Sequence, residues 1–188
     1  MAKDAPALWT PELSPTTIIL DAAPTDFVDA TVIDVAALGE IAADHYGHDG
    51  RHMVIASPDG PHRLWLREVK PEAPLAIIIP ADRNFAQRIA AALRFERRLR
   101  GAVSGQLPPG YRPTAFQRNR LFLLLNLLDA EQAGASRRAM ASSLLYRNST
   151  PMGRAEWKGS SQRRRTHRMI DEAKHMMVGG YRQLLLGS

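Results

Sequence analysis

The sequence has no cysteine in its 188 residues. This absence excludes a disulfide framework, a thiolate zinc site and a cysteine nucleophile, and it suits a reducing cytoplasm. Long apolar runs are also missing, because the leucine-rich stretch 123–128 is far shorter than the roughly 20 residues that a membrane-spanning helix needs. The first residues lack the charged segment and apolar stretch of a secretory leader. We therefore expect a soluble cytoplasmic protein without membrane contact.

Signatures of common enzyme classes are missing as well. The chain contains neither a phosphate-binding loop nor a dinucleotide fingerprint. Ser104 precedes a glycine, but it follows a predicted helix rather than a strand, which argues against a nucleophile elbow. The stretch 45–52 holds three histidines and Asp49, a candidate metal cluster, yet Gly47 and Gly50 interrupt the helix that this spacing needs and no distant ligand stands out. We predict no catalytic residue, no metal site and no cofactor.

Acidic and basic residues are strongly segregated along the chain. Residues 1–80 contain 5 Lys and Arg against 12 Asp and Glu, a net charge of −7, whereas residues 81–188 contain 20 against 7, a net charge of +13. The whole chain carries +6. A basic half of this density attracts polyanions, and nucleic acid is the commonest of them. The alternative is an arginine-rich helical surface that is merely solvated.

The N-terminal part of the chain predicts a small β-rich layer. β-Branched residues favour a strand at 16–20, and apolar spacing indicates a short amphipathic helix at 32–43. The runs 52–56 and 62–67 flank a Pro-Asp-Gly turn, which is the pattern of a β-hairpin. A further short strand is expected at 75–79.

A basic helix and a linker are expected at 81–112. Apolar residues recur with helical spacing over 85–100, while arginines fill the other faces of this helix. Asp82 is placed to cap the helix start. Prolines and glycines crowd 101–113, which indicates a loop before the C-terminal part.

Helices dominate the predicted structure of 113–188. Thr114 and Gln117 form a capping-box pattern ahead of a helix that contains the leucine-rich stretch, expected as a central core helix. Ser136 is placed to cap a second helix over 137–146. This region is the predicted DNA-binding subdomain.

A third, basic helix is expected to begin at 160–161 and to run through Met177. Two glycines at 179–180 end it. The connection 147–160 is much longer than the three or four residues of a simple helix-turn-helix, so the outline is that of an elaborated version. Trp157 is expected in its core, as large aromatics usually are.

Together these expectations describe an α+β protein. A small β-containing N-terminal part precedes a helical, helix-turn-helix-like C-terminal part. The predicted division is an acidic β-rich subdomain at 1–80, the basic helix and linker at 81–112 and the helical DNA-binding subdomain at 113–188.

The third helix is predicted to contact DNA through its N-terminal turns. Its apolar positions form one stripe that can dock on the other helices, which leaves the arginines on the opposite face. Arg164 and Arg168 are the predicted base-reading residues, because arginine bridges guanine O6 and N7 with two hydrogen bonds. His167 and His175 are expected at DNA contacts or on the surface rather than in catalysis. The other cations are predicted to contact phosphates. The full set of predicted contact residues is Arg137, Arg138, Lys158, Ser160, Ser161, Arg163, Arg164, Arg165 and Arg168.

Short motifs follow one another along nearly the whole chain. They are Leu8-Trp9-x-Pro11, Asp49-Gly50-Arg51-His52, Leu64-Trp65-Leu66, Ile79-Pro80-x-Asp82, Arg88-Ile89, Gly134-Ala135-Ser136, Trp157-Lys158, 163–168 and Gly179-Gly180-Tyr181-Arg182-x-Leu184-Leu185. In this order and spacing the chain resembles the RovC-like DNA-binding domain family. The resemblance implies a bacterial DNA-binding regulator, often encoded on mobile elements and related to transcription factors of type VI secretion. No segment matches the additional N-terminal domain that activators of this family carry. The alternatives are that the chain binds DNA without activating, needs a separately encoded partner, or acts as an antiactivator on a related regulator.

The leading hypothesis is a sequence-specific regulator that binds double-stranded DNA near the nucleoid. RNA polymerase, a homologous regulator and a second copy of the chain are open alternatives as protein partners. The runner-up is a protein-interaction module, an antiactivator that binds and blocks a related regulator. A DNA-processing enzyme ranks third, because the seven acidic residues of the basic half form no convincing metal-binding pair.

Overall fold

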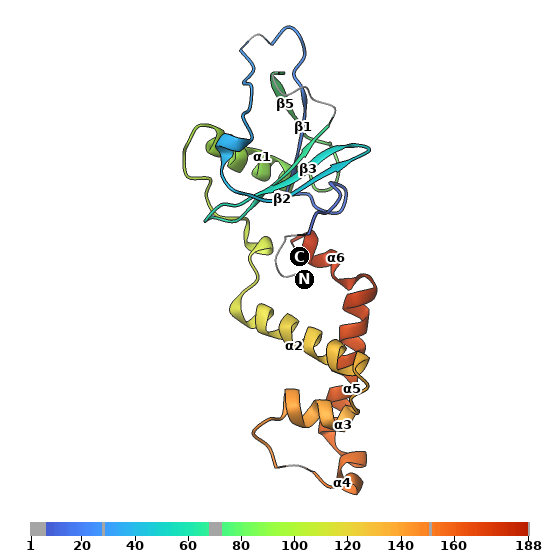
Figure 1. The fold of residues 1–188 in the computed structure, drawn as a ribbon. Helices are drawn as coiled ribbons and strands as arrows, with labels where there is room; N and C mark the ends of the chain where they lie inside the picture. The colour runs from blue at the N-terminus through green and yellow to red at the C-terminus, as the bar shows by residue number, and fades with distance from the viewer. Residues whose placement is uncertain (1–6, 28, 68–72, 151, 188) are drawn as a thin grey trace. The chain divides into compact units, whose positions relative to one another are not determined.

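The computed structural model describes residues 7–27, 29–67, 73–150 and 152–187 (Figure 1). The chain forms two compact units: unit 1 comprises Met1–Tyr111 and Leu185–Ser188, and unit 2 comprises Arg112–Leu184. Unit 1 contains a β-sheet and one long helix, whereas unit 2 is helical. The predicted α+β class, with strands before helices, is confirmed.

The described residues of unit 1 form a five-stranded sheet. The strands are β1 (Thr17–Ala22), β2 (Ile41–Gly47), β3 (Gly50–Ile55), β4 (His62–Leu66) and β5 (Leu75–Ile78). Their order across the sheet is β2-β3-β4-β1-β5. β1 runs parallel to β4, and the other neighbouring pairs are antiparallel. The strands predicted at 16–20 and 75–79 are confirmed as β1 and β5.

Two hairpins join β2, β3 and β4. The predicted hairpin is confirmed by the antiparallel pairing of β3 with β4. The helix predicted over 32–43 is wrong, because this fully described stretch forms one turn of 3-10 helix, η1 (Ala36–Leu38), and then enters β2. β2 pairs with β3 through a tight turn in which Gly50 has φ +127°, and a Cβ there would lie 2.2 Å from the carbonyl oxygen of Leu66. Only glycine fits this turn, and the cross-strand pairing that it permits outweighs a weak helical spacing.

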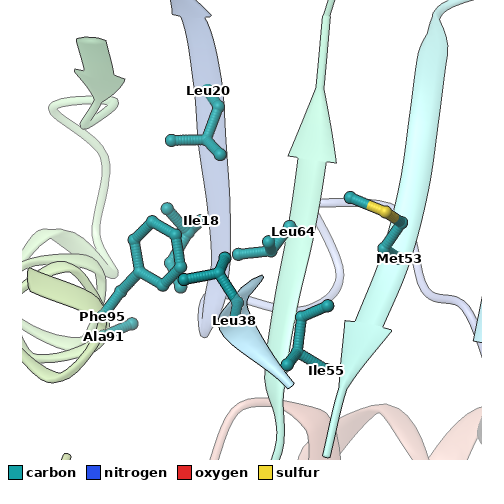
Figure 2. Packing of buried hydrophobic residues seen from close by; sticks show 8 residues of the cluster. All are labelled: Ile18, Leu20, Leu38, Met53, Ile55, Leu64, Ala91 and Phe95. Atoms are coloured by element: carbon teal, nitrogen blue, oxygen red, sulfur yellow. The ribbon is translucent and has the colours of Figure 1, made fainter. Parts of the chain in front are cut away.

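Helix α1 (Phe85–Leu99) packs on the sheet. Figure 2 shows Phe95 and Ala91 projecting from α1 toward the strands, where Ile18 of β1 and Leu64 of β4 belong to the same buried cluster. Burial of this apolar surface is the main force that holds the helix to the strands. The buried cluster comprises Ile18, Leu20, Leu38, Met53, Ile55, Leu64, Ala91 and Phe95.

The inner face of α1 differs from the predicted one. Leu93, expected inside, is 52% exposed. Arg88 and Arg94, expected on the outer faces, are buried, each only 6% exposed. The buried face of α1 is centred on Phe95, about one residue away from the face that helical spacing alone predicted.

The described part of unit 2 is built from helical segments, of which α2 and α5 are the longest. The segments are α2 (Ala115–Gln132), α3 (Arg137–Met140), the π-helical segment η3 (Ala141–Leu145), α4 (Arg154–Gly159), α5 (Ser161–His175), the π-helical segment η4 (Met176–Gly180) and α6 (Arg182–Leu185), which ends at the first residue assigned back to unit 1. The predicted capping box of α2 is confirmed: Thr114 Oγ1 accepts from the Gln117 backbone N at 3.2 Å, and Gln117 Oε1 accepts from the Thr114 backbone N at 2.8 Å. Ser136 caps α3 through the Ala139 backbone N at 3.2 Å.

A second buried cluster holds α2, α3 and α5 together. Two ion pairs reinforce the contact between α2 and α5: Arg120 with Glu172 at 2.7 Å, and Lys174 with Glu131 at 2.9 Å. The cluster comprises Leu124, Leu127, Met140, Met169, Ile170 and Ala173.

Three expectations about burial in unit 2 are wrong. Phe122 and Leu125, from the helix expected to be buried on most faces, are 63% and 53% exposed. Met177, expected in the apolar stripe of the third helix, is also exposed. Trp157 is half-buried and belongs to neither buried cluster. None of the described helices combines the length and apolar character needed to cross a bilayer.

Candidate nucleic-acid interface

Positive charge is concentrated at one end of unit 2. The unit as a whole contains 14 Lys and Arg against 5 Asp and Glu, a net charge of +9. Within it, residues 133–170 contain nine Lys and Arg and a single acidic residue, Glu156. Glu156 accepts a hydrogen bond from the Gly153 backbone N at the start of α4, at 3.4 Å. The segments α3, α4 and the first turns of α5 therefore form a strongly cationic surface.

Ser160 fixes the point where α5 begins. Its Oγ accepts from the Arg163 backbone N at 3.0 Å and lies 3.0 Å from the Trp157 carbonyl oxygen, to which it donates. The predicted helix start is thus confirmed. Ser160, predicted as a DNA contact, uses its hydroxyl inside the protein, whereas Ser161 is exposed.

The buried stripe of α5 determines which arginines face outward. Thr166, Met169, Ile170 and Ala173 are buried on one side. Arg164, Arg165 and Arg168 are exposed on the remaining surface. This arrangement leaves a row of guanidinium groups on the side that no described helix covers.

The arginines of α5 differ in how firmly they are held. Arg163 Nη1 donates to the Lys158 carbonyl oxygen at 2.9 Å, and Arg164 Nη1 donates to the Gly159 carbonyl oxygen at 3.3 Å. Among the described residues, no hydrogen bond or ion pair holds the side chain of Arg165 or Arg168. These two guanidinium groups are free to bind an external acceptor.

An open depression of about 550 Å³ lies between α3, α4 and the start of α5. It brings together four of the predicted contact residues, Arg137, Arg138, Lys158 and Arg163. The other predicted arginines, on the exposed face of α5, are not part of its lining. The full lining is Ser136, Arg137, Arg138, Arg154, Trp157, Lys158, Arg163 and His167.

Two lining residues, Arg138 and His167, interact with their surroundings in different ways. The Arg138 guanidinium donates to the Met152 carbonyl oxygen, which ties α3 to the loop before α4. Partial burial, and then the positive charges of Arg137 and Arg163, hold the pKa of His167 below its usual value, with Asp171 opposing them. The charges of Arg137 and Arg163 are therefore close enough to the His167 ring to act on its protonation.

Arg154 was not predicted from the sequence as a contact residue. It lies on α4, a helix inside the stretch that the sequence predicts to be a connection. The signal that could have found it is the Gly153 to Glu156 spacing, a weak form of the capping pattern.

A family model described as "T6SS, Transcription factor, DNA binding domain" (RovC_DNA-bd) matches residues 78–186. The chain belongs to this family. A second model, for a domain of unknown function (DUF7012), matches residues 16–77. No curated protein matches the chain.

The RovC family match includes α1, which lies in unit 1 with the sheet. Arg88 of α1 donates to both carboxylate oxygens of Asp82 and, at 3.2 Å, to the Pro11 carbonyl oxygen. Asp82 also accepts from the Asn84 backbone N at 2.9 Å, and Asn84 is the N-cap of α1, so the predicted capping role of Asp82 is corrected. The hydrogen bonds from Arg88 hold the pKa of Asp82 below its usual value.

Arg94 and Arg98 also bind within unit 1. Arg94 donates to the carbonyl oxygens of Gly105, Asp59 and Gly60 at 2.9 to 3.1 Å. Arg98 Nε donates to the Leu38 carbonyl oxygen at 3.0 Å. Arg88, Arg94 and Arg98, in the first part of the RovC match, therefore bind acceptors within unit 1.

The polar clusters that the sequence suggested for catalysis have structural partners. His52 stacks on Trp65, with ring centroids 5.7 Å apart, and its Nε2 lies 3.0 Å from Asp49 Oδ1. Ser104 is buried and hydrogen-bonds to His62 Nε2 at 3.0 Å. Among the described residues, no three His, Asp or Glu side chains are grouped to hold a metal ion.

Proposed function

We propose that this chain is a transcriptional regulator that binds double-stranded DNA in a sequence-specific manner through α3, α4 and α5. Membership in the RovC DNA-binding family supports DNA binding by a transcription factor domain. The proposal that α3, α4 and α5 form the DNA-binding surface depends on the positive charge of residues 133–170. This stretch contains nine basic residues and one acidic residue on exposed helices.

In this proposal α5 enters the major groove with its N-terminal turns. An α-helix with its side chains is about 10 to 12 Å wide, and the groove is about 12 Å wide. Arg164 and Arg168 lie one helical turn apart and are exposed, so both can reach base edges. Arg137, Arg138 and Lys158 would contact phosphates on either side, together with Arg163 and Arg165.

Fluorescence anisotropy with the full chain tests the proposal. One duplex carries the region beside the protein's own gene and the other a random sequence. The Arg164→Ala/Arg168→Ala variant should bind the first duplex roughly 30-fold more weakly, because each bidentate guanine contact contributes about 1 to 3 kcal/mol.

The matched control is Arg118→Ala/Arg182→Ala. It removes the same charge from exposed positions of unit 2 outside the cationic surface, and it should retain most of the preference between duplexes. If both double variants weaken DNA binding equally, the binding depends on total charge and not on Arg164 and Arg168 in particular. Absence of binding to either duplex would refute a stand-alone regulator.

Exposed apolar residues favour a second candidate function. Phe116, Phe122 and Leu125 of α2 are 75%, 63% and 53% exposed, and exposed large apolar side chains often mark protein contacts. The alternative is an interaction module that binds a related regulator and blocks it. Binding of a second RovC-family protein, retained in Arg164→Ala/Arg168→Ala and lost in Phe122→Ala/Leu125→Ala, would favour this function.

The biological setting belongs to the same proposal. We extend the proposal to a bacterial regulator that is encoded on a mobile element and acts at the nucleoid, and the T6SS description of the family favours the bacterial origin. Such a regulator would also contact RNA polymerase and form a homodimer. Size-exclusion chromatography with light scattering measures the oligomeric state directly.

A further inference from the structure

Six basic side chains from three helical elements line the depression between α3, α4 and α5. Five of them, four arginines and one lysine, are permanently charged near neutral pH. Their mutual repulsion is unfavourable in the free protein, and no described carboxylate lines the depression. An anion held there would relieve this repulsion and accept hydrogen bonds from several directions.

We propose that this depression seats a backbone phosphate of bound DNA, and that His167 joins the contact by taking up a proton when the phosphate arrives. The inference rests on the proposed DNA-binding function and adds to it a site, its ligand chemistry and a proton linked to binding.

The lining favours a phosphate over a base edge. Arg137 and Arg138 come from α3, Arg154 and Lys158 from α4, and Arg163 from α5. Cationic side chains that line one depression from different helices suit the tetrahedral oxygens of a phosphate, which accepts hydrogen bonds on several sides. A base edge, by contrast, presents donors and acceptors in one plane.

The surroundings of His167 explain why its proton would respond to DNA. Arg137 faces it from α3, Arg154 and Lys158 share the depression from α4, and Arg163 and Asp171 lie on α5 itself. Two charged residues of α2, Arg120 and Glu131, are engaged in ion pairs with other residues of α5. The segment η3 contributes only Ala, Ser and Leu.

The direction of the pH effect follows from these charges. In the free protein, partial burial and the neighbouring arginines keep the pKa of His167 below its usual value, so the ring is neutral near pH 7. A phosphate beside the ring raises that pKa in the complex. Because the bound state then holds more protons, DNA affinity increases as the pH falls through the pKa of the complex, and it becomes constant below the pKa of the free protein.

The experiment measures DNA binding by the full chain at constant ionic strength. Phosphate contacts are independent of sequence, so a random duplex is sufficient. Between about pH 8 and about pH 6, the parent should gain roughly threefold to tenfold in affinity, the range available to one linked proton. His167→Gln, which cannot titrate, should lose most of this gain. His175→Gln is the matched control, since His175 is exposed near the end of α5, outside the depression.

A salt titration tests whether the depression itself binds a phosphate. Arg137→Gln should lower the slope of log affinity against log salt by about one, because one fewer counterion is released. Arg118→Gln, on the exposed surface of α2, should leave the slope at its parent value. His167→Arg, which carries a fixed charge, should bind at about pH 8 as tightly as the parent binds at about pH 6.

The outcomes separate this inference from the proposed function. If the parent binds DNA but His167→Gln retains the full pH dependence, the role of His167 is overturned and the proposed function is untouched. If Arg137→Gln leaves the salt slope unchanged, the phosphate seat is overturned. If the parent binds no duplex, the proposed function fails and the seat fails with it. Circular dichroism melting of each variant establishes that it is folded.

Discussion

Arginines of α1 in unit 1 and of α5 in unit 2 have opposite environments. Arg88 and Arg94 are buried against carbonyl and carboxylate oxygens of their own unit. Arg165 and Arg168 are exposed, and no described residue holds their side chains. Both helices contain runs of arginine, so a charge count treats them alike. The difference is whether acceptors already lie within reach of the guanidinium group.

This contrast changes the meaning of the segregated charge. Residues 81–188 carry +13, but unit 2 alone carries +9, and part of the remainder belongs to arginines that join loops in unit 1. A guanidinium has five donors in a rigid plane, and several backbone carbonyls can satisfy it without any counter-charge. The positive charge of Arg88 and Arg94 therefore stabilises a fold, whereas that of Arg165 and Arg168 remains available for a ligand.

The largest effect that tests the contrast is on stability. Arg88→Ala removes a buried side chain and leaves Asp82 and the Pro11 carbonyl oxygen without their partner. We expect the free energy of unfolding to fall by about 3 kcal/mol. Arg168→Ala, at an exposed position, should change it by about 0.5 kcal/mol or less. Urea denaturation followed by circular dichroism measures both, and equal losses would show that the two environments are not distinct.

The second effect is on DNA affinity and has the reverse pattern. Arg163→Ala/Arg168→Ala should weaken binding to a random duplex roughly tenfold at moderate salt, because two phosphate or groove contacts are lost. Arg97→Ala/Arg100→Ala, which removes two exposed arginines of unit 1 near the end of α1, should weaken it much less. If the α1 variant weakens binding equally, unit 1 belongs to the DNA surface and the contrast between the helices fails.

Local signals in the sequence predicted much of this fold. The caps at Thr114, Ser136 and Ser160 depend on residues three positions apart, and all three form as expected. The β3–β4 hairpin follows from its Pro-Asp-Gly turn in the same way. The strand β2 was missed because its pairing with β3 competes with a short helical spacing, and only the partner strand decides between them.

Non-local contacts account for the rest. The burial of Arg88 depends on Asp82 and on Pro11, which is far away in the sequence, so its own helical position gives no sign of it. The cationic depression likewise combines α3, α4 and α5, and no pattern within a single helix predicts its shape. The residue types at the candidate site could be predicted from the sequence, but their assembly could not.

A third test compares histidines of the two units. Burial, and then the charges of Arg94 and Arg98, lower the pKa of His62 to about 4. A histidine that is neutral in the fold and titrates normally when unfolded reduces stability as the pH falls below its unfolded pKa. From about pH 7.5 to about pH 5.5 this linkage should remove about 1 kcal/mol from the free energy of unfolding.

His62→Gln identifies the residue responsible. Gln can hydrogen-bond to Ser104 as His62 does, but it does not titrate, so the loss between these two pH values should largely disappear. Urea midpoints at each pH measure it. His167→Gln should remove a smaller part of this pH dependence, because His167 is only partly buried whereas His62 is fully buried. An unaltered pH dependence in His62→Gln would contradict the assignment.

The smallest effect distinguishes two adjacent serines at the start of α5. Ser160 accepts from the Arg163 backbone N and donates to Trp157, so Ser160→Ala should lower the free energy of unfolding by about 1 kcal/mol. Its effect on DNA affinity should follow from fraying of the turn that carries the arginines. Ser161 is exposed, and Ser161→Ala should leave stability within about 0.5 kcal/mol of the parent while removing one donor to a phosphate. Thermal melting and anisotropy on the same samples separate the two roles, because a cap acts on both measurements and a simple contact acts only on the second.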